Sequence, residues 1–568
     1  MEDWQLHLYD DKDWGRSPMN GIDYIASILK QENVEWISCF PSNPIISACA
    51  KVNIRPIAFR HERGAVMAAD GYSRISMRKK FGVVAVQSQA GAENAMGGIA
   101  QAAADNIPIL ILLGGNSLDQ ISVKPNFSAV QKYQGWVKQV EAIYSPNQVG
   151  AVMRRAFNAL KNGPPGPVVV EMTTDVCQQG VPEEYQNYKS PSCSLQVPDT
   201  NEIANAIELW QKARKPVIWA GGGVLASNGS VPLKELAELT ATPVFCTMPG
   251  KSSFDERHPL ALGAGCGTTT EMAHKWLTES DLIIALGTSL TRSPYGQKIL
   301  PNKLIIHNTI DPSDINKDET AEIGLIGDTA LTVNQLISNI KESKDKYTFN
   351  DRTTVENEIA SIKNKWLKKW TPVLHSDEKP IAYYRVINEL NNVIDLENSI
   401  VTHDAGAPRD CLVPFFQATL PHSYIGWGKT THLGFGIPLI IGAKLAQPNK
   451  FCVNVMGDGA FGMSGTDIET AARSKVPITT ILLNNNNMAT YTGNNRGAIG
   501  EEARTEYGIS NMHGDYAKIA EGMGATGIKV TSPSEITPAV KQAQKLNAEG
   551  ITVLIEVITN IEERRSKF

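Results

Sequence analysis

Several features that mark other classes of protein are missing from this 568-residue chain. Its eight cysteines form no CxxC pair and have no zinc-type spacing with histidine, so neither a disulfide-stabilised secreted domain nor a zinc module is indicated. The longer apolar runs, such as IPILILL at 107–113, fall far short of the ~18 residues of a membrane-spanning helix. Positive charge is not in excess, since 54 Lys and Arg residues stand against 59 Asp and Glu. Nucleic acid and anionic membranes are therefore not expected partners.

The opening residues, MEDWQLHLYDDKDW, are acidic and lack the basic and apolar segments of a secretion signal. We therefore expect a cytoplasmic protein with reduced, mostly buried thiols. An apolar fraction of 42% and a charged fraction of 20% are typical of folded chains. At about 100–200 residues per domain, the length predicts three or four domains.

Three blocks of the chain alternate short β-branched runs with helix-length segments, the pattern of parallel α/β sheets. We predict three doubly wound parallel-sheet α/β domains. Segments 179–200 and 344–378 have few strand signals and are expected to connect the blocks. The predicted divisions are an N-terminal domain over 1–185, a central domain over 200–345, a third domain over 379–560 and a tail over 561–568.

The most informative stretch of the third block is a strand, a glycine-rich turn, a helix and a second strand. Strand CVNVM ends at Gly457-Asp458-Gly459, a helix is expected over about 463–474, and strand ITTILL leads to Asn485. Both polar side chains then emerge at the same edge of a parallel sheet, where ligands bind. A carboxylate, an amide oxygen and a backbone carbonyl suit Mg²⁺, and glycines admit a diphosphate. Alone, however, a GDG tripeptide is more often an ordinary βα turn.

The wider spacing makes the pattern specific. Ile441, Gly442, Pro448, Val453 and Val455 precede Gly457-Asp458-Gly459-Ala460, and the Asn pair follows at a matching distance. This segment resembles the thiamine diphosphate enzymes of the acetolactate synthase-like superfamily. The resemblance implies thiamine diphosphate and Mg²⁺ as cofactors, with Asp458, Asn485 and the backbone of Asn487 as metal ligands. It implies further cofactor contacts at Gly457, Gly459, Ala460, Met488 and Ala489, at the turn Asp404-Ala405-Gly406-Ala407, and at Leu433, which would support the bent cofactor.

The segment RPIAFRHERGAVMAADGYSR at 55–74 resembles the part of the family that carries the cofactor-activating glutamate, here Glu62. A carboxyl group bonded to the aminopyrimidine ring promotes loss of the thiazolium proton by acid–base catalysis. In isolation Arg60-His61-Glu62-Arg63 would instead be a solvated charge cluster. His61 either takes a direct catalytic part or orients the turn.

The segment 87–105 resembles the family stretch that packs on the pyrimidine, but Gln89-Ala90-Gly91 replaces the usual Gly-Pro-Gly. Gln89 and Asn94 either donate hydrogen bonds to substrate or cap a helix over 92–105. Because Glu62 and the diphosphate turn lie in different domains, the resemblance implies active sites shared across a homodimer, or a dimer of dimers.

The substrate is less clearly indicated than the cofactor. Phe127-Ser128 stands where the synthases have Phe-Gln, and 488–508 lacks their Gln and Trp. CFPSNP at 39–44 and GWGKTTHLGFG at 426–436 look closer to the 2-hydroxyacyl-CoA lyase and oxalyl-CoA decarboxylase branch. The first hypothesis is a lyase or carboligase that cleaves 2-hydroxyacyl-CoA to formyl-CoA and an aldehyde or ketone. The alternatives are an acetolactate synthase-like carboligase of 2-oxo acids and, in another class, a non-catalytic nucleotide-binding relative.

The central domain and the tail leave two further alternatives open. GTSLTRSPYG at 287–296 lacks the family's flavin-associated run, which makes FAD unexpected. One alternative is that this region binds ADP or CoA, with Asp311 placed for a ribose and Arg292 for a phosphate. The other is that it is a vestigial turn of the fold. Arg564, Arg565 and Lys567 in the tail either cover an anionic CoA ester or form a solvated end.

Overall fold

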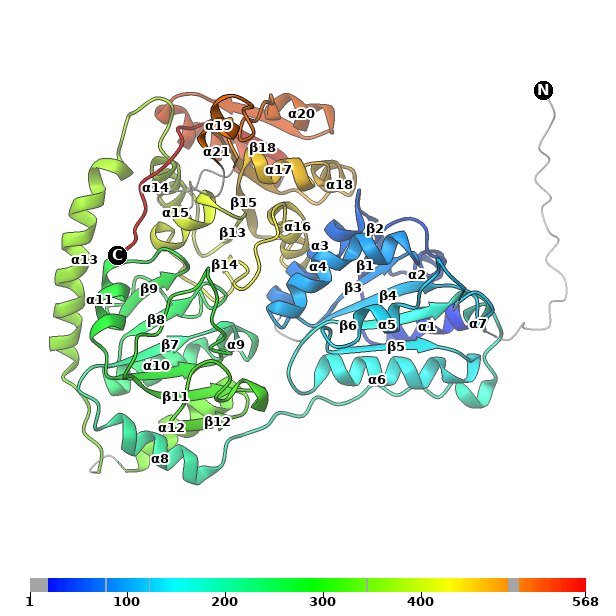
Figure 1. Ribbon diagram of the computed structural model, residues 1–568, viewed down its shortest axis with the longest axis horizontal. Helices are drawn as coiled ribbons and strands as arrows, with labels where there is room; N and C mark the ends of the chain where they lie inside the picture. The colour runs from blue at the N-terminus through cyan, green and yellow to red at the C-terminus, as the bar shows by residue number, and fades with distance from the viewer. Residues whose placement is uncertain (1–18, 77–78, 122, 344–345, 489–499) are drawn as a thin grey trace.

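Three six-stranded parallel sheets, each flanked by helices, make up the computed structural model of this chain (Figure 1). The structure describes residues 19–76, 79–121, 123–343, 346–488 and 500–568. The predicted α/β class with three doubly wound parallel sheets is confirmed. None of the described helices is long and apolar enough to cross a bilayer.

The N-terminal domain has the strand order β2-β1-β3-β4-β6-β5. Its central strands are fully buried Val, Ile and Leu runs, as expected for a parallel sheet covered on both faces. The strands are β1 Trp36–Cys39, β2 Arg55–Ala58, β3 Gly82–Val86, β4 Ile109–Gly115, β5 Gln139–Ile143 and β6 Val168–Thr173. The helices are α1 Gly21–Gln31, α2 Ile45–Lys51, α3 Glu62–Ser76, α4 Ala90–Ala104, α5 Ala129–Tyr133, α6 Val149–Lys161 and α7 Thr174–Cys177.

The central domain has the order β12-β11-β10-β7-β8-β9, the arrangement of dinucleotide-binding folds. Its strands are β7 Pro216–Ala220, β8 Val244–Thr247, β9 Ala261–Gly265, β10 Leu282–Leu286, β11 Leu304–Thr309 and β12 Ile323–Ile326. Its helices are α8 Thr200–Trp210, α9 Gly222–Ala226, α10 Ser230–Thr240, α11 Glu271–Glu279 and α12 Thr329–Glu342. The long helix α13, Arg352–Leu374, then runs along the outer edge of the molecule toward the C-terminal domain (Figure 1).

The C-terminal domain repeats the N-terminal topology, with the order β14-β13-β15-β16-β18-β17. Its strands are β13 Ser399–His403, β14 Tyr424–Ile425, β15 Phe451–Gly457, β16 Thr479–Asn484, β17 Thr526–Val530 and β18 Val553–Ile558. Its helices are α14 Tyr383–Val393, α15 Ala407–Phe415, α16 Gly436–Ala446, α17 Asp458–Ser464, α18 Asp467–Arg473, α19 Glu501–Thr505, α20 Tyr516–Gly522 and α21 Ile536–Ala548.

The helix predicted over 463–474 differs in the structure. It begins at Asp458 and is split into α17 and α18. Gly465 lies at the break, where an added Cβ would come within 2.4 Å of the Phe461 ring. The close packing admits only glycine, and glycine weakens a helix.

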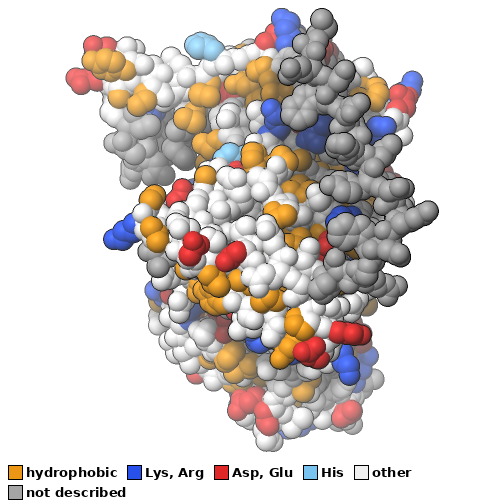
Figure 2. Space-filling view, turned by 90° about the vertical axis from the view of Figure 1, so that its right-hand side faces the viewer, with side chains coloured by type: hydrophobic (Ala, Val, Ile, Leu, Met, Phe, Trp, Pro, Cys, Tyr) orange, Lys and Arg blue, Asp and Glu red, His pale blue; other side chains and the backbone are white. Residues whose placement is uncertain are grey.

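Helices α3 and α16 pack directly against each other and join the N-terminal domain to the C-terminal domain. An added Cβ at Gly442 would lie 1.9 Å from the Ala68 carbonyl oxygen, and one at Gly71 would lie 2.2 Å from that of Leu439. Glycine on each helix therefore permits the close crossing. All eight cysteines are unpaired and seven are buried, as expected. On the face shown in Figure 2, acidic and basic side chains are interspersed with apolar ones.

Candidate active site

The C-terminal sheet has its topological switch point between β13 and β15. These strands are neighbours, but β13 connects to β14 on one side and β15 connects to β16 on the other. In open parallel sheets the crevice at such a point, beyond the carboxyl ends of the strands, is where ligands bind. Asp404 follows β13 there, and Asp458 follows β15. The topology therefore brings both predicted cofactor-binding turns to one crevice.

Asp458 is only 2% exposed and begins α17, with Gly457 at the N-cap. Its Oδ1 accepts a hydrogen bond from the backbone N–H of Gly459 at 2.9 Å, whereas its buried Oδ2 has no hydrogen-bond partner among the described residues. Burial raises the pKa of this carboxyl group, and backbone N–H groups, those of Asn485 and Asn487 among them, act in the opposite direction. A buried carboxylate oxygen without a partner is well suited to a cation.

The segment after β16 faces Asp458. Asn485 Oδ1 accepts from the N–H of Asn487 at 2.9 Å, and its Nδ2 donates to the Tyr383 hydroxyl at 2.9 Å. Met488 lies against Gly459, where an added Cβ would be 2.9 Å from its Cγ. One carboxylate, one amide oxygen and nearby carbonyls are the hard oxygen donors that fit Mg²⁺. Among the predicted contacts, Ala489 lies outside the described residues.

The side chain of Asp404, in the turn after β13, is held by backbone N–H groups. Asp404 is fully buried and accepts hydrogen bonds from the N–H groups of Ala405 at 2.7 Å, Gly434 at 3.1 Å and Gly436 at 2.8 Å. Burial raises its pKa to about 6, against the effect of these bonds. Its carboxyl group therefore organises the loop around Leu433.

The rest of this turn remains open toward the crevice. Gly406 has φ +80°, and an added Cβ would meet nothing within 4 Å. The nine-residue helix α15 begins at Ala407, and the free backbone N–H groups of a helix N-terminus suit an anion. Leu433, between Gly434 and the preceding loop, is half-buried and packs against the core shared with the N-terminal domain. The residues present fit a diphosphate cofactor held by a cation.

Glu62 lies at the start of α3 and is 3% exposed. Asn94 on α4 donates from Nδ2 to Glu62 Oε2 at 3.0 Å, so Asn94 orients the carboxyl group and does not cap its helix. His61 is exposed, and its Nδ1 accepts from the N–H of Arg63 at 3.1 Å, a contact typical of a helix N-cap. The structure thus gives His61 the turn-orienting role that the sequence analysis left open.

Gln89 occupies an unusual position at the N-cap of α4. Its backbone has φ 54° and ψ −109°, a conformation that favours glycine, and its side chain makes no capping hydrogen bond. Its buried Nε2 has no partner among the described residues. The capping alternative for Gln89 is therefore wrong, and strained residues of this kind cluster at functional sites.

The segments that carry the two halves of the site contact each other within the single chain. Arg63, next to Glu62, donates to the Met463 carbonyl of α17 at 2.8 Å, and the Arg60 N–H donates to Asp467 at 3.1 Å. The charge of Arg63 also lowers the pKa of Asp404 in opposition to burial. Assembly of the site across two subunits stays a prediction, because the structure describes one chain.

A cavity of about 720 Å³ lies where the three domains meet. Arg292 and Asp311 are among its lining residues, but Arg292 is paired with Glu319 at 2.8 Å, and Asp311 accepts from the N–H of Ser313 at 3.0 Å. Sequence reasoning missed its lining residues from the C-terminal domain, His422, Tyr424 and Lys429. Nothing local marks them, because they lie more than a hundred residues after Arg292 and Asp311 in the sequence.

These residues place polar groups at the cavity wall. His422 Nε2 and the Tyr424 hydroxyl are buried and make no hydrogen bond to the described part of the chain. Lys429 is half-buried, and burial lowers its pKa against the opposing effect of Asp105. Unsatisfied polar groups around a cavity of this size are typical of a ligand site.

The Phe127-Ser128 pair and the C-terminal tail, two other regions considered for substrate contact, make contacts within the protein. Ser128 caps α5 and donates to Glu171 at 2.8 Å, and Phe127 packs under the Lys132 ammonium at 3.8 Å. The tail descends from β18 to the central domain (Figure 1). Ser566 accepts from Trp366 and bonds the backbone of Thr269. Arg564 pairs with Glu562 and Glu378, and the lid role of the tail stays a prediction.

Comparison with known proteins agrees with this geometry. Three models of the thiamine pyrophosphate enzyme family match the chain in order: the N-terminal TPP binding domain at 19–142, the central domain at 203–336 and the C-terminal TPP binding domain at 404–557. A probable acetolactate synthase large subunit of Methanococcus aeolicus is 31% identical, with 92% of this chain and 90% of the relative covered.

Two more relatives show the same coverage along the whole chain. The probable acetolactate synthase large subunit of Methanocaldococcus jannaschii is 30% identical over 92% of this chain and 90% of its own length. Acetolactate synthase isozyme 3 large subunit of Escherichia coli is 26% identical over 96% of both. These names match the predicted alternative better than the 2-hydroxyacyl-CoA lyase hypothesis. With its three matched domains and a crevice that fits the cofactor, the chain belongs to the thiamine pyrophosphate-dependent enzymes.

Proposed function

We propose that this protein is a carboligase of the acetolactate synthase type, which decarboxylates a 2-oxo acid and joins the remaining fragment to a second carbonyl compound. The observation that carries the proposal is the full-length similarity to acetolactate synthase large subunits, together with a crevice that retains Glu62, Asp458 and Asn485. Bound thiamine diphosphate supplies a nucleophilic carbon that adds to the substrate carbonyl.

The residues of this chain divide the work at the cofactor. We assign the diphosphate to the backbone of Gly406, Gly457 and Gly459, and Mg²⁺ to Asp458 and Asn485 with the carbonyl of Asn487. Glu62, held by Asn94, exchanges a proton with the aminopyrimidine ring, and its burial keeps bulk water from that proton. Fixed placement of the carboxyl group is what makes the transfer fast.

The experiment is a substrate panel with thiamine diphosphate and Mg²⁺ present. We expect carbon dioxide release and a carboligation product from pyruvate or 2-oxobutyrate, and no product from 2-hydroxyacyl-CoA esters. Glu62→Gln, assayed in parallel, is the control for cofactor-dependent turnover. Formyl-CoA from a hydroxyacyl-CoA, without carbon dioxide from any 2-oxo acid, would reverse the assignment in favour of the CoA lyase.

For the central cavity we propose a ligand that contains an adenine nucleotide, such as ADP, CoA or a flavin dinucleotide. Support comes from the dinucleotide-fold strand order, the cavity volume of about 720 Å³ and the unpartnered groups of His422 and Tyr424. Acid extraction of the purified protein followed by chromatography should release a nucleotide, and an absorbance spectrum separates flavin from ADP or CoA. Nucleotide-free protein that binds none of the three at millimolar concentration would contradict the assignment.

A further inference from the structure

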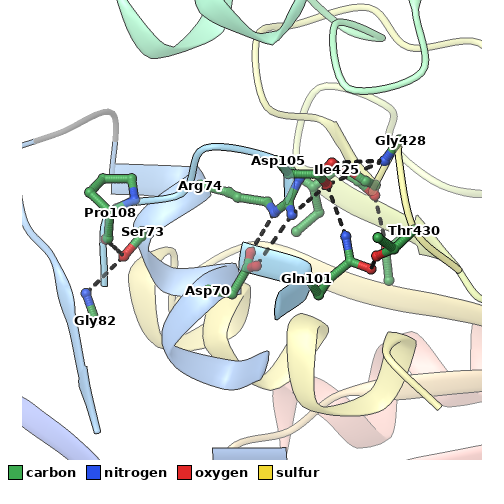
Figure 3. A network of polar contacts seen from close by, with 12 residues as sticks. Asp70, Ser73, Arg74, Gly82, Gln101, Asp105, Pro108, Ile425, Gly428 and Thr430 are labelled. Atoms are coloured by element: carbon green, nitrogen blue, oxygen red, sulfur yellow. Dashed lines mark hydrogen bonds and ion pairs between the residues drawn. The ribbon is translucent and has the colours of Figure 1, made fainter. Parts of the chain in front are cut away.

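A buried ionic cluster joins the N-terminal domain to the loop that carries Leu433 (Figure 3). Asp70 and Arg74 lie on α3, and Gln101 and Asp105 lie at the end of α4. The Arg74 guanidinium bonds both carboxylates, with Nη2 2.9 Å from Asp105 Oδ2. The side chains of Asp70 and Asp105 are at most 1% exposed and that of Arg74 is 8% exposed. We call these four residues the α3–α4 clamp.

The remaining polar atoms of the clamp all bind one loop, residues 426–435. Arg74 Nη1 donates to the Gly426 carbonyl at 2.7 Å. The Gly428 N–H donates to Asp105 at 3.2 Å, and the Thr430 hydroxyl donates to Gln101 Oε1. The clamp therefore fixes every second residue at the start of the loop (Figure 3).

The far end of the same loop is fixed by Asp404, which accepts from Gly434 and Gly436. Leu433 lies between the two attachments. Glycines at 426, 428 and 434 give this segment little conformational preference of its own, so its shape depends on these contacts. Without the clamp, the start of the loop would lose its side-chain hydrogen bonds to α3 and α4, and Leu433 would be held by packing and by the Asp404 end.

The clamp is also continuous with the activating glutamate. Glu62 begins α3, and Asn94, which holds it, lies on α4. The same two helices thus carry the Glu62–Asn94 pair toward one end and the clamp toward the other. Any shift of the loop relative to these helices changes the position of Leu433 relative to Glu62.

We propose that the α3–α4 clamp is a positioning device that places Leu433 for cofactor binding; the inference rests on the proposed thiamine diphosphate site. Stability alone does not account for the cluster, because buried ion pairs are often no more stabilising than apolar packing of equal volume. Asp105 is the central member, since it contacts Arg74, Gln101 and the Gly428 N–H.

The test compares Asp105→Asn with wild-type protein by two measurements that do not use activity. Hydrogen exchange of the cofactor-free protein should show about ten-fold faster exchange in peptides that cover 425–436. Thiamine diphosphate affinity with saturating Mg²⁺, from tryptophan fluorescence quenching, should weaken by about 10–100-fold, the usual effect of losing a supporting contact.

Glu32→Gln is the matched control. Glu32 is a carboxylate of the same domain, 5% exposed, which pairs with Lys161 and Tyr188 and makes no contact with the loop. Its loss should lower the unfolding midpoint and leave loop exchange and cofactor affinity unchanged. Arg74→Lys keeps the charge but loses the forked geometry, and an intermediate effect is expected. If Asp105→Asn does not fold, Thr430→Val removes one clamp contact and should weaken cofactor affinity by a few-fold.

The outcomes separate the two claims. Wild-type protein that binds no thiamine diphosphate would overturn the proposed function. Wild-type protein that binds it, with Asp105→Asn binding equally well and exchanging equally slowly in 425–436, would overturn the clamp alone. The clamp would also be overturned if Glu32→Gln lowers cofactor affinity as much as Asp105→Asn does, because the loss would then reflect global stability.

Discussion

The N-terminal and C-terminal domains have the same strand order and differ in the chemistry of their turns. The sheets β2-β1-β3-β4-β6-β5 and β14-β13-β15-β16-β18-β17 correspond strand by strand. The turn after β15 holds Asp458 with a free carboxylate oxygen, whereas the turn after β3 holds Gln89 in a strained conformation. One turn is equipped for a cation and the other is not.

A second pair of turns differs in length. The turn after β2 is short and leads directly to Glu62, but the turn after β14 is the long loop 426–435 with Leu433. The apolar strands thus set where each turn lies, and one or two turn residues set what it can bind. The predictions below test this division, starting with the largest effect.

Asp458→Ala should abolish Mg²⁺-dependent retention of thiamine diphosphate, because it removes a buried carboxylate oxygen that has no hydrogen-bond partner among the described residues. Equilibrium dialysis of the cofactor with and without chelator measures this. The matched control is Gln89→Ala, at the equivalent turn of the N-terminal domain, which should leave cofactor affinity within about three-fold. Equal affinity losses in both variants would show that the two turns do not differ in this respect.

Glu62→Gln should slow turnover by about two to four decades while cofactor affinity stays nearly intact, since it removes an acid–base group but keeps the shape of the side chain. Single-turnover kinetics at saturating cofactor measures the effect. Near-normal turnover would refute the activation role. The Asn94 hydrogen bond to Oε2 survives if the amide oxygen faces Asn94, so folding should be unaffected.

Much of this arrangement was accessible from the sequence. Long apolar runs such as those of β4 and β15 predicted buried parallel strands, and the spacing between Asp458 and Asn485 predicted that they would meet at one sheet edge. Glu62 follows β2 and begins α3, next to the apolar helix that the sequence indicated after it. These features depend on local periodicity and on topology, both of which the residues encode directly.

Other features depend on contacts between distant segments. Asp404 was assigned to the cofactor as part of its turn, and the sequence did not predict that its carboxyl group accepts from the N–H groups of Gly434 and Gly436, some thirty residues away. The clamp and the cavity groups of His422 and Lys429 arise only when three domains pack together. The helix break at Gly465 likewise reflects the Phe461 ring, which no propensity records.

His422 offers a test of matched turns. It lies two residues before β14 with φ 62°, and Asn53 lies two residues before β2 with φ 58°. Burial lowers the pKa of His422 to about 4. Because the unfolded side chain binds its proton near pH 6.5, stability falls as pH drops from about 6.5 toward 4.

His422→Asn introduces the residue type found at the matching turn of the N-terminal domain, Asn53. Asparagine tolerates this conformation and does not titrate. Urea unfolding at pH 7 and pH 5 should show that wild-type protein loses about 2 kcal/mol more than the variant on acidification. Asp404 and Asp467, whose pKa values burial raises to about 6, act in the opposite direction and equally in both proteins. Identical pH dependence in the two proteins would contradict the assignment.

Gln89→Gly should have the smallest effect on stability and the most informative sign. Glycine adopts φ 54° without strain, so the free energy of unfolding should rise by about 1 kcal/mol in urea. Asn53→Gly is the control, because Asn already tolerates its φ of 58° and little gain is expected. A side chain retained despite backbone strain implies a functional contact. We therefore expect kcat/KM for the 2-oxo acid to fall in Gln89→Gly while cofactor affinity is unchanged. If the variant is less stable than wild type, the Gln89 side chain supports the fold, and its strain is then no sign of a contact with substrate.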